Sequence, residues 1–282
     1  MRVTRHYVIS GPGVRFALVS DLQDKEYGNL IEQIRSESPD AILLTGNIIT
    51  RMDPDASEWN WEKMDKWLTR IYGKSPYERL IDSVGNKLHA KYSGQNAETR
   101  SHGVQFLREV SSIAPTFYSV GNLEWYFTEF DKALFSEHGI TLLDNADVEV
   151  EIKGKKILLG GLSTRYDLDW LVDYSHKKGF KVLLCHHPEQ YRQLVEETMI
   201  DSFDLIVGGH YHGGQWRIGN RGVYVPRIGM MQKDVAGQFG RLIISAGVVN
   251  TSRLPRFGNP CELVIIDAEE TKNERSVCCS TP

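Results

Sequence analysis

Five short apolar runs in this sequence each end in side chains that carry nitrogen or oxygen donors. Such runs predict strands buried on both faces of a sheet, and an α/β fold gathers the loops after its parallel strands at one edge. The runs and the side chains after them are residues 15–20 with Asp21 and Gln23, 41–45 with Asn47, 115–120 with Asn122, 181–185 with His186 and His187, and 205–207 with His210 and His212. We therefore expect an α/β fold in which these side chains meet.

The last of these strand ends is the most distinctive, because glycines lie on both sides of its two histidines. Residues 208–214 read Gly-Gly-His-Tyr-His-Gly-Gly. Glycine lets the backbone turn sharply and pass close to a bound group. Neutral imidazole is the commonest metal ligand among side chains. An isolated His-x-His would favour a turn with two exposed histidines, and the four other strand ends favour a metal site instead.

The remaining segments alternate between predicted helices and strands. Apolar spacing predicts helices at 29–36, 103–111, 130–138, 168–176 and 189–197, and strands at 141–143, 241–245 and 263–266. Lys153-Gly154-Lys155 predicts a hairpin between 148–152 and 156–159. Gly139 is expected to end the helix before it.

A long connection separates Asn47 from Asn122. Within it, a stripe of apolar residues predicts a helix at 57–71, and its members are Trp61, Met64, Leu68 and Ile71. We expect a single domain, 1–282, with a helical insert at about 51–112 and a polar C-terminal tail from about 269. The insert either covers the site or binds a partner, as long connections often do, or it packs on the outer face of a sheet.

The composition narrows the class of protein. Hydrophobic residues make up 41% and charged residues 25%, which is ordinary for a globular chain, and the net charge of −4 argues against a dedicated nucleic-acid-binding protein. No apolar run is long enough to span a membrane. The four cysteines lack zinc-finger spacing, which favours a reducing compartment and a cytoplasmic location. The oligomeric state stays open.

Imidazole and carboxylate side chains together suit divalent ions such as zinc, manganese or iron. We expect one or two such ions as cofactors. Taken singly, Asn47 or Asn122 would be a turn residue. Taken together, the candidate ligands are Asp21, Gln23, Asn47, Asn122, His186, His210 and His212.

The chain resembles the calcineurin-like metallophosphoesterases, and among them a small bacterial phosphodiesterase branch. The most specific segment is 209–215, Gly-His-Tyr-His-Gly-Gly-Gln, and segments 185–188 and 254–260 are also similar to that branch. The resemblance covers 15–266. It implies a four-layer αββα sandwich of two mixed sheets. It also implies hydrolysis of phosphomonoesters or phosphodiesters by metal-activated water.

Three positions depart from the family pattern. The family has histidine at the position of Gln23, a metal-bridging aspartate at Asn47, and histidine at Leu123. Unlike the family aspartate, Asn47 carries no negative charge that would offset the repulsion between two cations. Leu123 cannot donate a proton, and placed acid–base groups are worth about 10² to 10⁴ in rate. One ion, in the histidine-rich half of the site, is therefore easier to accommodate than two.

Asn122 and His187 are the candidate catalytic residues, and Glu124 is a further candidate for the missing acid. Arg253 and Arg256 are candidates to bind the phosphate of a substrate, although turn and surface roles suit them equally. We expect a metal-dependent phosphoesterase that acts on a small molecule. The alternative is an inactive protein of the same fold that serves as a binding or scaffolding module, because fold does not guarantee activity.

Overall fold

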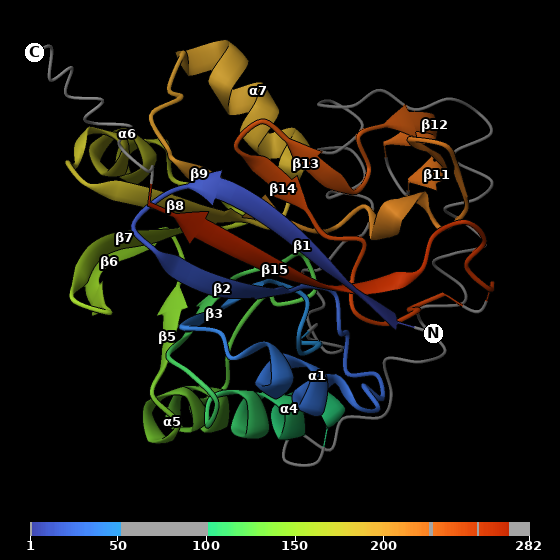
Figure 1. Cartoon of the computed structure of the whole chain (residues 1–282), viewed down its shortest axis with the longest axis horizontal. Helices are drawn as coiled ribbons and strands as arrows, with labels where there is room; N and C mark the ends of the chain where they lie inside the picture. Colours follow the sequence, from blue (N-terminus) through green and yellow to red (C-terminus); the bar gives the residue numbers. More distant parts are fainter. Residues whose placement is uncertain (1, 52–100, 226–227, 253, 271–282) are drawn as a thin grey trace, which may run out of the picture.

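The computed structural model describes residues 2–51, 101–225, 228–252 and 254–270, which form two large mixed sheets (Figure 1). The first sheet has the strand order β1 (Arg2–Ser10), β15 (Cys261–Glu269), β2 (Val14–Val19), β3 (Ala41–Thr45), β4 (Thr116–Ser119), β5 (Ile140–Leu143). The second has the order β13 (Gly237–Phe239), β14 (Leu242–Ile244), β9 (Leu205–Gly208), β8 (Phe180–Cys185), β7 (Lys155–Leu162), β6 (Ala146–Ile152). A separate small sheet contains β10 (Arg217–Ile218), β11 (Arg221–Val225) and β12 (Gly229–Lys233).

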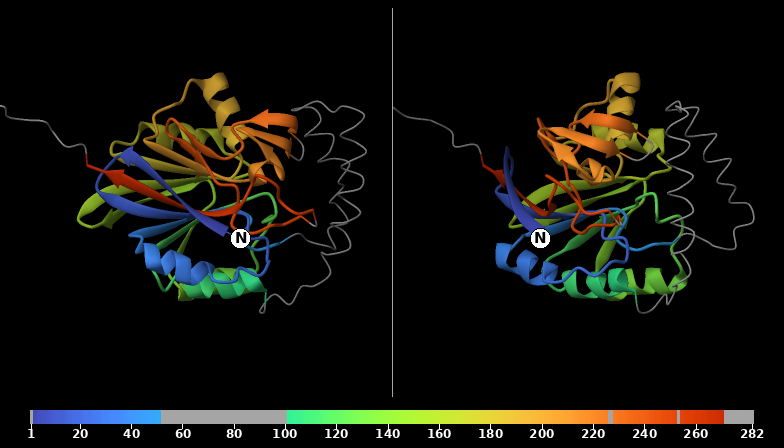
Figure 2. Two further views of the ribbon diagram at one scale, coloured as in Figure 1. Left: turned by 45° about the vertical axis from the view of Figure 1, so that its right-hand side comes forward. Right: turned by 90° about the vertical axis from the view of Figure 1, so that its right-hand side faces the viewer.

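Helices cover the outer faces of both large sheets (Figures 1 and 2). One apolar cluster lies between the first sheet and helices α1 (Leu30–Glu37), α4 (His102–Val110) and α5 (Glu129–Glu137). Another lies between the second sheet and helices α6 (Leu168–His176) and α7 (Pro188–Thr198). A third cluster lies between the two sheets. The four-layer αββα sandwich expected from the sequence is confirmed.

Strand β8 illustrates how the sequence produces these layers. Val182 and Leu184 belong to the cluster between the sheets, whereas Leu183 and Cys185 belong to the cluster beneath the helices. Successive strand residues point to opposite faces, so a strand buried on both faces needs an unbroken apolar run. The parallel pairs β2–β3–β4–β5 and β7–β8–β9–β14 then place the following loops at one edge of each sheet.

The helices predicted in the described part of the chain are confirmed, with ends that differ by one residue at most. Gly139 has φ of 62°, as expected for a glycine directly after a helix. Strand β1 was not predicted, because its residues are mostly half-buried or exposed and lack a continuous apolar run. It pairs along its whole length with β15, a partner from the other end of the chain. Strands β10 to β13 are short and were also missed.

The predicted helix at 57–71 and most of the helical insert lie outside the described residues, as do residues 271–282 of the expected tail. The single-domain organisation of the whole chain therefore stays a prediction. Among the described helices, none combines the length and the apolar character that crossing a membrane requires.

A buried ion pair ties α5 to the loop after β3. Arg51 donates from Nε and Nη2 to the two carboxylate oxygens of Asp131, at 2.7 and 2.6 Å. Both side chains are almost completely buried, with exposed fractions of 5% and 0%. Asp131 also caps α5 by accepting from the Thr128 amide. The backbone of Arg51 bonds to Leu123 and Trp125, so the pair fixes two strand-end loops at once.

We expect Asp131→Ala to lower the free energy of unfolding by about 3–5 kcal/mol, because it leaves the Arg51 charge buried without its partner. The control is Lys132→Ala, at the next position, where the ion pair with Glu129 is exposed. That substitution should cost no more than about 1 kcal/mol. Urea denaturation followed by circular dichroism measures both values. Equal losses in the two variants would contradict a stabilising role for the buried pair.

Candidate metal centre

The loops after five strands of the two large sheets meet at one place and bring the predicted side chains together. Asn122, after β4, belongs to the first sheet, and His186 and His210, after β8 and β9, belong to the second. His186 Nε2 lies 3.0 Å from Asn122 Oδ1. The ring centroids of His186 and His210 are 5.2 Å apart. The expected convergence of the strand ends is therefore observed.

Asp21 is fully buried at the centre of this arrangement. Its Oδ2 accepts hydrogen bonds from the Ser20 hydroxyl at 2.7 Å and from the His210 amide at 3.0 Å. Its Oδ1 lies 3.9 Å from His186 Nε2 and 3.6 Å from His212 Nε2. Burial opposes ionisation, but the two imidazoles and the two hydrogen bonds outweigh it and lower the pKa of Asp21. Asp21 is thus a carboxylate facing two imidazole nitrogens.

Asn47 is buried beside Asp21, and its hydrogen bonds fix the orientation of its amide. Oδ1 accepts from the Leu123 amide at 2.9 Å. Nδ2 therefore points to the other side, 3.3 Å from Asp21 Oδ1 and 3.2 Å from Asn122 Oδ1. An amide nitrogen donates hydrogen bonds and offers no lone pair to a metal. Asn47 as a metal ligand stays a prediction that would require this amide to turn.

The contact between His186 and Asn122 brings two lone pairs together. His186 Nδ1 lies 2.7 Å from the Thr45 carbonyl, so Nδ1 carries the proton and Nε2 the lone pair. Burial lowers the pKa of His186 to about 4, which keeps the ring neutral. Asn122 Oδ1 already accepts from Asn47, so Nε2 faces an acceptor oxygen at 3.0 Å. Two lone pairs this close repel unless a cation joins them, and the donor set therefore fits a metal ion.

The loop after β9 carries His210 and His212 in an unusual backbone conformation. The two histidines have φ of 69° and 48°. Gly209, just before them, leaves no room for a side chain, because a Cβ there would lie 1.9 Å from Ser20 Oγ. This close approach brings His212 Nε2 within 3.3 Å of Gln23 Nε2. Gln23 thus turns its amide nitrogen towards His212, and its predicted role as a ligand is untested.

His187, a predicted catalytic residue, lies beside two other histidines of the site, His186 and His210. Its ring centroid is 4.9 Å from that of His186 and 4.0 Å from that of His210. Its Nδ1 lies 2.9 Å from Glu189 Oε1. The same carboxylate oxygen lies 3.7 Å from His210 Nε2. Glu189 was not identified from the sequence. The available signal was a carboxylate two residues after a histidine at the start of a helix.

Glu124 faces the protein backbone. Its carboxylate accepts from the amides of Ile48, Ile49 and Gly121 and from the Tyr118 hydroxyl. Burial raises the pKa of Glu124 to about 7, against the opposing effect of these donors. The described contacts therefore assign Glu124 to holding the loops after β3 and β4 together.

Arg256, a predicted phosphate-binding residue, is engaged by the backbone. Its Nη1 donates to the Ala246 carbonyl at 2.6 Å and its Nη2 to the Val249 carbonyl at 2.9 Å. Arg253, the other candidate, lies outside the described residues. The substrate-binding role of both arginines remains a prediction.

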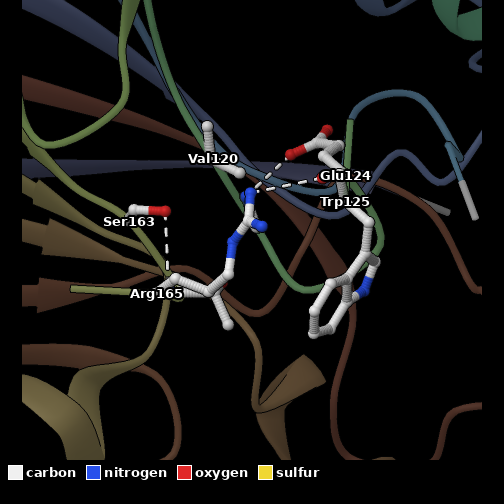
Figure 3. A pocket seen from close by; sticks show the side chains of 7 residues that line it. Val120, Glu124, Trp125, Ser163 and Arg165 are labelled. Atoms are coloured by element: carbon white, nitrogen blue, oxygen red, sulfur yellow. Dashed lines mark hydrogen bonds between the residues drawn. The ribbon is translucent and has the colours of Figure 1, made fainter. Parts of the chain in front are cut away.

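A small pocket beside the Asn122 loop contains a different arginine (Figure 3). Arg165 reaches toward the loop that carries Glu124 and Trp125, and its Nη2 donates to the Trp125 carbonyl at 3.2 Å. Its guanidinium carbon lies 5.6 Å from the centroid of the Trp125 ring, which is within the range of a cation–π contact. Arg165 is thus an exposed cation close to the site that the sequence reasoning did not single out.

Asn259 holds the His212 loop from the opposite side. Its Nδ2 donates to the carbonyls of His212 and Gln215 at 2.7 and 3.2 Å, and its Oδ1 accepts from Arg217 at 2.6 Å. The side chain is buried, so water cannot replace these bonds. Asn259 therefore helps to position His212.

We expect Asn259→Ala to lower the free energy of unfolding by about 1–3 kcal/mol, because two carbonyls and an arginine lose a buried partner. Asn250→Ala is the matched control, since Asn250 lies in the same region but is exposed. That variant should change stability by less than about 0.5 kcal/mol. Chemical denaturation of both proteins tests this, and an Asn259→Ala variant as stable as the control would contradict the assignment.

Curated relatives match parts of the chain. An uncharacterized protein of Bacillus subtilis, YpbG, is 32% identical over 33% of this chain and 36% of its own length. An uncharacterized metallophosphoesterase of Campylobacter jejuni, Cj0846, is 28% identical over 54% of this chain and 40% of its own length. The chain therefore spans between a third and two fifths of these relatives.

Among solved structures, sulfate thiohydrolase SoxB of Thermus thermophilus aligns with a TM-score of 0.43 and 14% identity, over 93% of this chain and 58% of that protein. The family model of calcineurin-like phosphoesterases matches residues 14–214, which include the loops after all five strands. The chain thus belongs to the calcineurin-like phosphoesterase family.

Proposed function

We propose that this protein hydrolyses small-molecule phosphomonoesters or phosphodiesters with the help of a divalent metal ion. The observation that carries this proposal is the approach of His186 Nε2 to Asn122 Oδ1 at 3.0 Å, where two lone pairs face each other. Membership of the calcineurin-like phosphoesterase family supports the reaction class.

The residues of the site have different parts in this proposal. Asn122, His186 and His210 would hold one ion, and Asp21 and His212 would offer a weaker second position. When bound, a divalent ion polarises a phosphoryl oxygen and lowers the pKa of a water molecule. Thr45 orients His186 by accepting from its Nδ1 at the backbone carbonyl, and Asn259 holds the His212 loop by donating from its Nδ2 to the His212 carbonyl.

The substrate-binding part rests on the arginines near the site. Arg165 is the described cation that lines the neighbouring pocket, and its guanidinium lies beside the loop of Asn122. Arginine is well suited to phosphate oxygens because its planar guanidinium can donate two parallel hydrogen bonds. We therefore favour Arg165 over Arg256 for this role.

The second candidate function is that of a binding or scaffolding module without catalysis. The observation in its favour is the orientation of Asn47 and Gln23, whose amide nitrogens face Asp21 and His212. Leu123 adds to it, because this buried side chain has no proton to give to a leaving group. The two functions differ in whether the metal-loaded protein turns over an ester.

The direct test uses para-nitrophenyl phosphate and bis-para-nitrophenyl phosphate with protein stripped of metal and then reloaded with manganese, zinc or iron. We expect hydrolysis that a chelator abolishes. His210→Ala should lower the rate by about 10- to 100-fold, because the affinity for the metal falls. His176→Ala, on the exposed face of α6, should retain the full rate. A folded, metal-loaded protein that hydrolyses neither ester with any of these metals would favour the binding module.

Restoring the family residues tests the departures themselves. Asn47→Asp would place a carboxylate oxygen beside Asp21, where an amide nitrogen now lies at 3.3 Å, so the metal-free protein should become less stable and bind metal more tightly. Leu123→His should act on the rate, by about 10²- to 10⁴-fold. When Gln23→His is combined with these two substitutions, we expect the triple variant to bind more metal and to hydrolyse phosphodiesters faster.

Elemental analysis and steady-state kinetics measure these effects. No gain in either quantity, in a triple variant that remains folded, would show that the site has diverged beyond these three positions.

A further inference from the structure

His187 has a buried ring nitrogen that nothing in the described structure satisfies. Its Nδ1 contacts Glu189 Oε1 at 2.9 Å, so Nδ1 carries the proton and Nε2 the lone pair. Nε2 is buried and has no hydrogen-bond partner among the described residues. A buried polar atom without a partner is unfavourable and rare in folded proteins, so its position calls for an explanation.

The lone pair of His187 belongs to a compact group of three imidazoles. One ring nitrogen from each of His186, His187 and His210 lies within 4.8 Å of the other two. His186 presents Nε2, because its Nδ1 is bonded to the Thr45 carbonyl. Glu189 Oε1 accepts a hydrogen bond from His187 Nδ1 at 2.9 Å and lies 3.7 Å from His210 Nε2, a longer electrostatic contact. The arrangement is that of metal-binding histidines held by an outer carboxylate.

We propose that His187 is a direct ligand of the divalent ion, so that three imidazoles hold it and Glu189 positions His187. This inference rests on the proposed metal dependence of the site, and it assigns to His187 a role different from acid catalysis. It also names the class of ion. A site of imidazoles suits zinc, iron, copper or nickel, whereas manganese and magnesium favour oxygen-rich sites.

The third imidazole offsets what the loop after β3 lacks. Asn47 turns its nitrogen towards the site, because its oxygen accepts from the Leu123 amide. An ion at this site would therefore lack an oxygen ligand and a negative charge on that side. His187 would supply a nitrogen ligand on the other side. The carboxylate of Glu189, hydrogen-bonded to the Nδ1 of that imidazole, would supply a negative charge.

The test compares metal binding in full-length variants and does not depend on catalysis. Metal-free protein is titrated with zinc against a chromophoric chelator, and separately with cobalt(II) while its visible spectrum is recorded. We expect His187→Ala to raise the Kd for zinc by at least about 100-fold and to change the cobalt spectrum. Glu189→Gln should raise the Kd by about 10- to 100-fold, as the loss of an outer partner typically does. His176→Ala, an exposed histidine, should match the wild type.

X-ray absorption of the zinc-loaded wild type provides a second measurement, which needs no variant to fold. Three coordinating imidazoles are expected, and two would overturn the proposal, as would an unchanged Kd and cobalt spectrum in folded His187→Ala. Either of those results leaves the proposed hydrolysis intact. Three imidazoles in a protein that hydrolyses no ester would instead overturn the hydrolysis and leave the ligand assignment standing. A wild type that binds no metal overturns both.

Discussion

The hydrogen bond between His186 and Thr45 connects the two sheets and fixes the direction of one imidazole at the site. His186 Nδ1, after β8, donates to the carbonyl of Thr45 at the end of β3, at 2.7 Å and across 141 residues of sequence. The bond places the proton on Nδ1, and burial keeps the ring neutral, so the Nε2 lone pair must face the other strand ends. Without this bond the ring would be free to turn, and the imidazole would lose its fixed direction towards Asn122 and Asp21.

Beside that imidazole, two residues that depart from the family pattern turn amide nitrogens towards the site. Asn47 donates to Asp21, and the Gln23 amide nitrogen lies beside His212. Both amides therefore offer N–H groups to Asp21 and His212 in this half of the site. The opposite half, near His187, keeps lone pairs that no described donor satisfies. This asymmetry is the physical ground for proposing one ion rather than two.

The sequence predicted most of the elements that build the two sheets, because a strand buried on both faces needs an unbroken apolar run. Runs such as those of β3 and β8 have no other stable environment in a folded chain of this size. Strand β1 escaped this reasoning, because its edge position lets polar residues remain exposed and its stability comes from pairing with β15. The spacing of apolar residues along β1 does not indicate that it pairs with a strand at the other end of the chain.

The sequence by itself determined the fold class and the meeting of the strand-end side chains, since parallel strands place their ends at one edge. Only the tertiary structure decided which atoms of those side chains face one another. Asn47 could have presented its oxygen, but the Leu123 amide takes it. The Arg256 guanidinium donates to two backbone carbonyls, which its position in the sequence does not indicate. Donor and acceptor directions depend on neighbours brought together by packing, and a linear sequence does not specify them.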